Sequence, residues 1–141
     1  MKALILTNNP RVYDEFSPDK EGRAGKFETE YQDGMSQTEI LKLARDRIHL
    51  GAKLVIHPMM GRIKPHETPY KSVFLEVPDE RDEAAGSFTT DFTSLQIIED
   101  SIHETEKFIN HTYMAKYTDE MLPDLQYIDL LLILSGMEEY K

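Results

Sequence analysis

Apolar and polar positions alternate with two different periods in the first third of the chain. Residues 2–7 (KALILT) form a short, nearly continuous apolar run, which is typical of a β-strand covered on both faces. Residues 27–31 (FETEY) place two glutamates between larger or β-branched side chains, with the period of two expected of a half-exposed edge strand. Ser36 followed by Glu39 has the pattern of a capping box, and apolar residues then recur at helical spacing up to Gly51. We therefore expect two strands followed by an amphipathic helix of about four turns.

The rest of the pattern predicts two more strands and three more helices. Pro10 stands at the first turn of a short helix, because the fixed φ of proline suits that position. Residues 53–57 (KLVIH) and 72–77 (SVFLEV) are apolar, β-branched runs of strand length. Residues 92–113 carry apolar side chains at spacings of three, four and seven, the pattern of one long helix. Residues 127–134 also have strand length, but they are rich in leucine, which favours a final helix.

This order of elements predicts an α/β fold. We expect a single, three-layer-like domain over residues 1–141, with a mostly parallel four-stranded sheet flanked by helices and two helices at the C-terminus. The acidic stretch near residues 78–90 is expected to be a linker between two halves of this domain. The connection before the fourth strand is left open, since a hairpin would make that strand antiparallel and a crossover would make it parallel.

Charge and composition exclude several classes of function. The chain has 16 Lys and Arg against 26 Asp and Glu, and its formal charge of −10 disfavours nucleic acid or an anionic bilayer as a partner. It has no cysteine, which excludes disulfides, zinc-thiolate sites, iron–sulfur clusters and thiol catalysis. No apolar run approaches the roughly 18 residues of a membrane span, and we do not expect a signal peptide, because the apolar run at the start is short and soon broken by polar residues. We expect a soluble, cytoplasmic protein.

A basic island interrupts the acidic chain. Residues 42–71 carry 7 basic and 2 acidic side chains, a balance of 7 − 2 = +5. Such an island could attract a small anion or an acidic partner surface, or it could be the solvated face of the helix before Gly51.

Polar residues follow two of the predicted strands. The first strand is followed by Asn8 and Asn9, and the third ends at His57. Ligands of open parallel sheets bind beyond the carboxyl ends of the strands, so these side chains would converge if the two strands were neighbours. His57 opens a stretch, residues 57–72 (HPMMGRIKPHETPYKS), whose three prolines restrict φ and stiffen the loop. A stiff polar loop is suited to a preorganised anion or amide site.

Each candidate residue also has a purely structural interpretation. His57 could be a general base or an anion ligand, or it could bond the loop backbone. Lys64 and Lys71 could neutralise a carboxylate or phosphate, or they could be solvated charges. Glu67 and Tyr70 could contact a ligand, although internal hydrogen bonds of the loop are the favoured interpretation. The two asparagines are also frequent turn residues.

The candidate ligand-binding set takes its members from both segments. It comprises Asn8, Asn9, His57, Gly61, Lys64, Glu67, Thr68, Tyr70, Lys71 and Ser72. His57, His66 and Glu67 are residue types that bind metals, but their spacing matches no known site, so we predict neither a metal nor a cofactor. The motifs of dinucleotide sites, P-loops and serine hydrolases are absent.

Four stretches carry a family resemblance. They are ILTNNP, HPMMGRIKPHETPYKS, LQIIEDSIHETEKF and LQYIDLLLI. The chain resembles the GrdX family, small proteins encoded beside the glycine, sarcosine and betaine reductase genes of anaerobic bacteria. The most specific part is the pattern HPxxGxxKPxETPYKS, which occupies residues 57–72. The resemblance implies a link to the reductase complex, whose subunits are then possible partners, without implying a reaction.

Three functions remain open at this point. The first is an accessory or sensing protein that binds a small carboxylate or phosphate, or a subunit of the complex, through residues 57–72. The second is an enzyme of unknown reaction in which His57 is the acid or base and Lys64 and Lys71 stabilise negative charge. The third is a structural module that docks through residues 130–134 of the last helix. A covalent thiol relay is excluded by the lack of cysteine, whereas an oligomer is left open.

Overall fold

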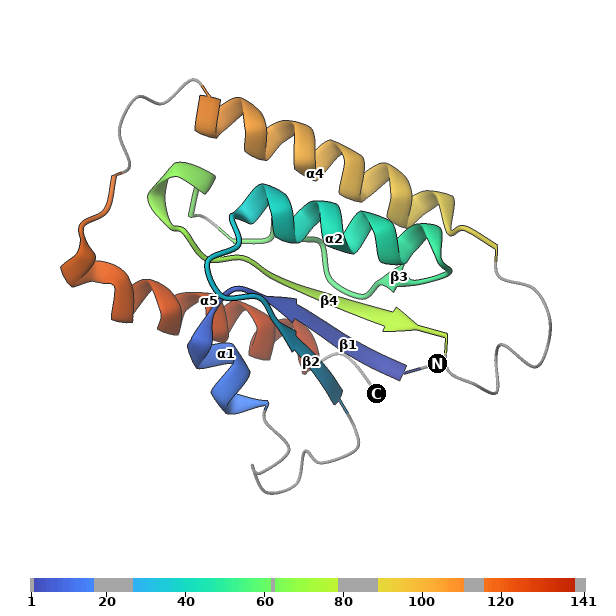
Figure 1. Ribbon diagram of the computed structural model, residues 1–141, viewed down its shortest axis with the longest axis horizontal. Coiled ribbons are helices and arrows are strands. Elements are labelled where there is room, and N and C mark those ends of the chain that lie inside the picture. The colour runs from blue at the N-terminus through green and yellow to red at the C-terminus, as the bar shows by residue number, and fades with distance from the viewer. Residues whose placement is uncertain (1, 17–26, 62, 79–88, 111–115, 139–141) are drawn as a thin grey trace.

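The protein is an α/β domain built on a four-stranded sheet, as its computed structural model shows (Figure 1). The structure describes residues 2–16, 27–61, 63–78, 89–110 and 116–138. The strands are β1 (Lys2–Thr7), β2 (Phe27–Tyr31), β3 (Lys53–Leu54) and β4 (Ser72–Val77), in the spatial order β2-β1-β4-β3. The α/β class and the number of strands agree with the sequence prediction.

The prediction of a mostly parallel sheet was wrong, because the sheet is mixed. β1 pairs with β2 in parallel, whereas β4 runs antiparallel to both β1 and β3. Between β3 and β4, the described residues 55–61 and 63–71 form one 3-10 turn, η1 (Pro65–Glu67), and no α-helix that could carry the chain across the sheet. The chain therefore turns back, and β4 enters in the opposite direction. β4 lies between β1 and β3, so the first and third strands are not neighbours.

The α-helices begin where the sequence signals place them. They are α1 (Pro10–Glu15), α2 (Gln37–His49), α4 (Phe92–Asn110) and α5 (Leu122–Met137), and a second 3-10 turn, η2 (Asp119–Met121), precedes α5. The capping box of Ser36 and Glu39 is present at α2. Asp91 caps α4, since its Oδ2 accepts a hydrogen bond from the Ser94 N–H at 3.1 Å. The predicted final helix is confirmed, with two helices at the C-terminal end.

Two predicted elements end earlier than expected. The third strand stops at Leu54, although the Val55 N–H still donates to the Phe74 carbonyl at 3.0 Å. The long helix α4 stops at Asn110, and residues 111–115 lie outside the described part of the chain. The predicted linker near residues 78–90 lies mostly outside it as well, because residues 79–88 are not described.

Helices cover both faces of the sheet, and each face has its own apolar core (Figure 1). Leu4 and Leu6 of β1 belong to the cluster formed with α2 and α4. Ala3 and Ile5, which alternate with them, belong to the cluster formed with α1 and α5. This burial on both faces explains why β1 is a continuous apolar run.

Part of the basic island pairs within the protein. On α2, Lys42 lies 3.5 Å from Glu106 and Arg45 lies 3.6 Å from Glu99 of α4, while Arg47 pairs with Glu30 of β2 at 2.5 Å. These pairs are partly solvent-exposed, so each contributes at most about 1 kcal/mol. The basic residues of α2 thus form ion pairs with glutamates of β2 and α4. This pairing favours the structural interpretation of the basic island.

Candidate functional site

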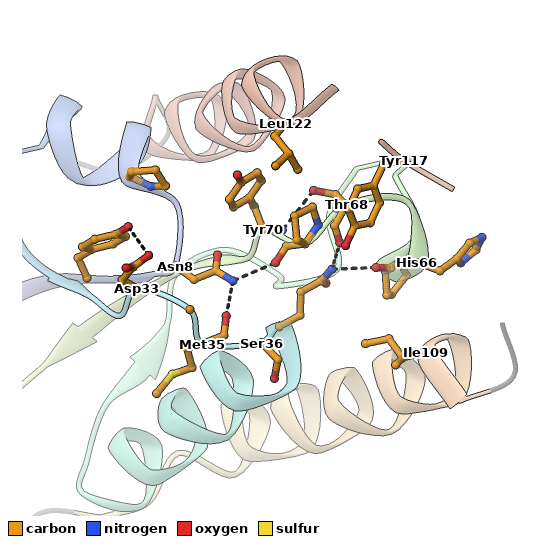
Figure 2. Close-up of a pocket in the computed structure, with 16 residues that line it drawn as sticks. Asn8, Asp33, Met35, Ser36, His66, Thr68, Tyr70, Ile109, Tyr117 and Leu122 are labelled. Carbon is orange, nitrogen blue, oxygen red and sulfur yellow. Dashed lines mark hydrogen bonds between the residues drawn. The ribbon is translucent and has the colours of Figure 1, made fainter. Parts of the chain in front are cut away.

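A pocket of about 570 Å³ opens where β1 and β2 end (Figure 2). Its walls come from the ends of these two strands, the start of α2, the loop over residues 65–70 and the segment around η2. The lining residues are Asn8, Pro10, Tyr31, Asp33, Gly34, Met35, Ser36, Gln37, Pro65, His66, Thr68, Pro69, Tyr70, Ile109, Tyr117 and Leu122. The pocket lies at the carboxyl ends of two parallel neighbours, where open sheets commonly bind ligands.

Asn8 ties three parts of the pocket wall together. Its Nδ2 donates to the Met35 carbonyl at 2.7 Å and to the Pro69 carbonyl at 2.9 Å (Figure 2). Its Oδ1 accepts the Lys71 N–H at 2.9 Å. The buried side chain of Asn8 therefore holds the loop at a fixed distance from the turn after β2, and its partners lie far along the chain rather than in its own turn.

Gln37 holds the same loop from the other side. This buried side chain at the start of α2 donates through Nε2 to the Pro65 carbonyl at 2.8 Å and also to the Thr68 carbonyl. The Thr68 hydroxyl in turn accepts the Tyr70 N–H at 3.2 Å. Two amide side chains and two prolines thus give the loop one shape before any ligand arrives.

Tyrosines form much of the side wall. Tyr31 stacks on Tyr13 with ring centroids 5.1 Å apart, and its hydroxyl donates to Asp33 Oδ1 at 3.1 Å. Burial, and then the hydrogen bond and the charge of Asp33, raise the pKa of Tyr31 above its ordinary value. On the opposite side, the Tyr70 hydroxyl accepts the Gln126 Nε2–H of α5 at 2.7 Å. Both rings are therefore fixed by contacts outside the pocket.

His66 contributes less to the cavity than its position suggests. Its ring stacks on Phe108 of α4, with centroids 5.7 Å apart, and points away from Tyr70 and Tyr117 in Figure 2. Its buried Nδ1 has no hydrogen-bond partner among the described residues. Its ring therefore fixes the loop against α4.

A second polar cluster lies beneath the loop, around Asp129 of α5. Asp129 Oδ2 accepts hydrogen bonds from Asn9 Nδ2 at 2.9 Å and from the Ser72 hydroxyl at 2.7 Å. The Ser72 hydroxyl is 2.6 Å from the Thr7 hydroxyl, which must donate because the Ser72 hydrogen is already used. The Lys71 ammonium donates to the Pro58 carbonyl at 2.7 Å and adds a positive charge near the carboxylate. This cluster joins α5 to the ends of β1 and β4.

Burial dominates the titration of this cluster. It raises the pKa of Asp129 above its ordinary value, while the hydrogen bonds from Asn9 and Ser72 and the charge of Lys71 act in the opposite direction. Burial also lowers the pKa of Lys71, and the charge of Asp129 partly offsets this effect. The neighbouring hollows measure about 40 and 30 Å³, room for little more than a water molecule.

The structure divides the predicted site residues among three places. Asn8, Thr68 and Tyr70 line the pocket, whereas Asn9, Lys71 and Ser72 belong to the Asp129 cluster. The remaining four belong to the loop over residues 57–72.

The other four residues shape the loop itself. His57 is exposed, its Nδ1 accepts the Met59 N–H at 3.1 Å, and it borders the 30 Å³ hollow. Gly61 has a φ of +105° and lies against Leu132. The Lys64 N–H donates to Glu67 Oε1 at 2.8 Å, as expected for a carboxylate that stabilises the loop from within.

The crevice was expected between the first and third strands, but the pocket lies between the ends of β1 and β2. The predicted site therefore lacked three lining residues, Tyr31, Asp33 and Gln37. A prediction that β1 and β2 pair in parallel would have placed them near Asn8. Asp129 was missed too, although a single carboxylate inside the leucine-rich run YIDLLLIL is a recognisable signal of a buried polar contact. Tyr117 precedes the last helix and carries no comparable signal.

No group of three or more His, Asp or Glu side chains in the described part of the chain is arranged to hold a metal ion. In the same residues, no helix is both long enough and apolar enough to cross a membrane.

Comparison with known proteins gives one match. The family model described as GrdX-like protein matches residues 4–138, nearly the whole chain. No curated protein and no solved structure matches the chain. A family model that covers this much of the sequence includes both the pocket and the Asp129 cluster, so the chain belongs to the GrdX-like family.

Proposed function

We propose that this chain is an accessory protein of the glycine reductase system that binds a small molecule in the pocket between the ends of β1 and β2. Membership of the GrdX-like family fits an association with that system in general. The proposed binding element is the loop over residues 57–72, of which the part over residues 65–70 forms a pocket wall.

The observation that carries the proposal is the preorganisation of this wall. Asn8 and Gln37 together make four hydrogen bonds from their side-chain amides to loop and turn carbonyls, two each. A cavity whose walls are already ordered loses little conformational entropy when a ligand binds. Its volume of about 570 Å³ lies within the range of small-molecule sites.

The sequence-based hypothesis of a carboxylate or phosphate ligand depends on Lys64 and Lys71. Neither lysine is among the residues that line the pocket. Lys64 Nζ lies 5.5 Å from the centre of the Phe108 ring, and Lys71 Nζ bonds the Pro58 carbonyl. The proposal therefore rests on the pocket and assigns these lysines structural contacts. His57 is exposed and is not among the residues that line the pocket. The pocket therefore does not support the alternative of an acid–base enzyme.

The test is a thermal-shift and calorimetric screen of the purified chain with glycine, sarcosine, betaine, acetyl phosphate, phosphate and a general small-molecule library. A ligand at 100 times its Kd adds about 2.7 kcal/mol to the free energy of unfolding, which raises the Tm by several degrees. Tyr117→Ala removes part of the pocket wall and should weaken binding at least tenfold. Tyr127→Ala is the matched control, because Tyr127 is 45% exposed on α5 and lies outside the pocket.

A ligand that binds the parent and the Tyr127 variant equally, but binds the Tyr117 variant weakly, supports the proposal. Equal binding to all three chains would show that the ligand binds outside the pocket, and it would refute the proposal. A screen in which no compound binds at millimolar concentration would refute it as well.

A second candidate function, docking to a subunit of the reductase complex, has one observation in its favour. Tyr127, Ile128 and Leu131 form an outward apolar stripe on α5, each at least 37% exposed. A helix that is apolar on all sides is usually covered. Leu131→Asp should abolish co-elution with purified reductase subunits, whereas Leu50→Asp, at a leucine that is 69% exposed on another element, should not.

A further inference from the structure

We propose that the ligand of this pocket is an uncharged molecule of drug-like size with a planar ring, and that the pocket excludes anions. This inference rests on the proposed function and adds the chemical class of the ligand. Four features of the pocket lead to it: its volume, the charge of its lining, the arrangement of its rings and the polar atoms of its wall.

The volume is too large for a ligand of a few atoms. A cavity of about 570 Å³ is in the range that buries a drug-sized molecule. An amino acid as small as glycine would leave most of this space to water, and most of the wall would make no contact with it. Tight binding needs a ligand that touches several walls at once, since each apolar contact contributes only a small free energy.

The charge of the lining disfavours an anion. Among the described residues that line the pocket, none is Lys or Arg, and Asp33 contributes a carboxylate. Asp33 is exposed at the end of β2, and the whole chain carries a formal charge of −10. A phosphate or carboxylate would therefore enter against the charge of Asp33 and against the net charge of the chain.

The rings and prolines of the lining suit a flat partner. Tyr31 is held by its stacking on Tyr13, and Tyr70 by the hydrogen bond from Gln126. Tyr117 adds a third ring to the lining. Fixed aromatic rings bind other rings by stacking or edge-to-face contact without first losing side-chain entropy.

The polar atoms of the wall suit a neutral ligand with hydrogen-bond acceptors. The Thr68 oxygen accepts the Tyr70 N–H, and the Tyr70 oxygen accepts the Gln126 amide. In the described part of the chain, neither hydroxyl donates its own hydrogen to the protein. Each can therefore donate to a carbonyl or ring nitrogen of the ligand.

The test compares matched pairs in which the ring is constant and the charge changes. The probes are adenosine and AMP, riboflavin and flavin mononucleotide, and indole-3-ethanol and indole-3-acetate, measured by calorimetry, with glycine as the small probe. In at least one pair, the neutral member should bind, and its anionic partner should bind at least tenfold more weakly. Asp33→Asn should reduce this difference, because it removes the carboxylate charge from the pocket. Tyr117→Ala should weaken the neutral probe, and Tyr127→Ala should not.

The same measurements distinguish a wrong ligand class from a wrong binding site. If an anion or a small amino acid binds in a Tyr117-dependent way and no neutral ring compound does, the ligand class is wrong and the pocket remains a binding site. If the two members of every pair that binds do so equally, the exclusion of anions is refuted. If nothing binds, or if the Tyr117 and Tyr127 variants behave alike, both proposals fall.

Discussion

Replacing Asp129 by alanine should detach the polar contact between α5 and the sheet. The carboxylate accepts two hydrogen bonds, from Asn9 at 2.9 Å and from Ser72 at 2.7 Å. Hydrogen bonds to a charged group contribute about 1.5–3 kcal/mol each. Because the desolvation of the buried carboxylate offsets part of this gain, we take the lower end and expect Asp129→Ala to reduce the free energy of unfolding by about 3 kcal/mol. For a domain of this size, the Tm should fall by roughly 10 °C.

Urea denaturation followed by circular dichroism measures this loss. Asp124→Ala is the matched control, since Asp124 is an exposed carboxylate in the first turn of the same helix. It should cost no more than about 1 kcal/mol, the contribution of a charge near a helix N-terminus. Removing the nearby cation together with the carboxylate, in Lys71→Met/Asp129→Ala, should cost less than the sum of the single changes, because each single change leaves one buried charge uncompensated.

A loss below about 1 kcal/mol for Asp129→Ala, or a loss no greater than that of Asp124→Ala, would contradict this role of the carboxylate. In either case, apolar packing alone would hold α5, and the cluster would not explain why the helix carries an aspartate among leucines.

Three further changes probe other parts of the fold. Asp91→Ala should cost about 1 kcal/mol through loss of the α4 cap. The hydrogen bonds from Ser94 hold the pKa of Asp91 below its ordinary value, so this stability is fully present above that value and is lost as the pH falls through the lowered pKa. The difference between parent and variant in urea midpoint should therefore disappear in strong acid, and a constant difference would contradict the assignment. Gly136→Ala should destabilise by about 1–3 kcal/mol in thermal denaturation, because its methyl group would overlap Ile56, although alanine is the better helix former; an unchanged Tm would show that Ile56 moves freely. Ile98→Ala, at a fully buried site, should cost about 2–5 kcal/mol in urea denaturation, whereas Ile109→Ala, at a site that is 41% exposed, should cost less than 1 kcal/mol; equal losses would contradict the assigned core.

Local signals in the sequence were sufficient for most of the elements. Ser36 and Glu39 locate the start of α2 because capping depends on side chains within the same turn. The leucine-rich segment forms helix α5 because leucine has a high helix propensity. Such interactions link residues three or four positions apart, so a single sequence contains them completely.

Strand order and direction could not be predicted in the same way. The pairing of β1 with β4 joins Thr7 to Ser72, and no local pattern specifies it. The pocket depends on this non-local arrangement, because it decides which turn faces Asn8. The sequence therefore indicated the loop over residues 57–72 and the asparagine, but it did not indicate Gln37 or the partners of Asp129, because these hydrogen bonds join different elements.

The most direct test of the proposed binding site is a ¹H–¹⁵N correlation spectrum of the chain, recorded with and without a compound that binds in the screen. The account predicts that the amides of Gly34, Thr68 and Tyr70 shift together, while those of Ile128 and Leu131 on the outward face of α5 do not. Shifts that gather on that outward face, with Gly34, Thr68 and Tyr70 unchanged, would contradict a binding site between the ends of β1 and β2.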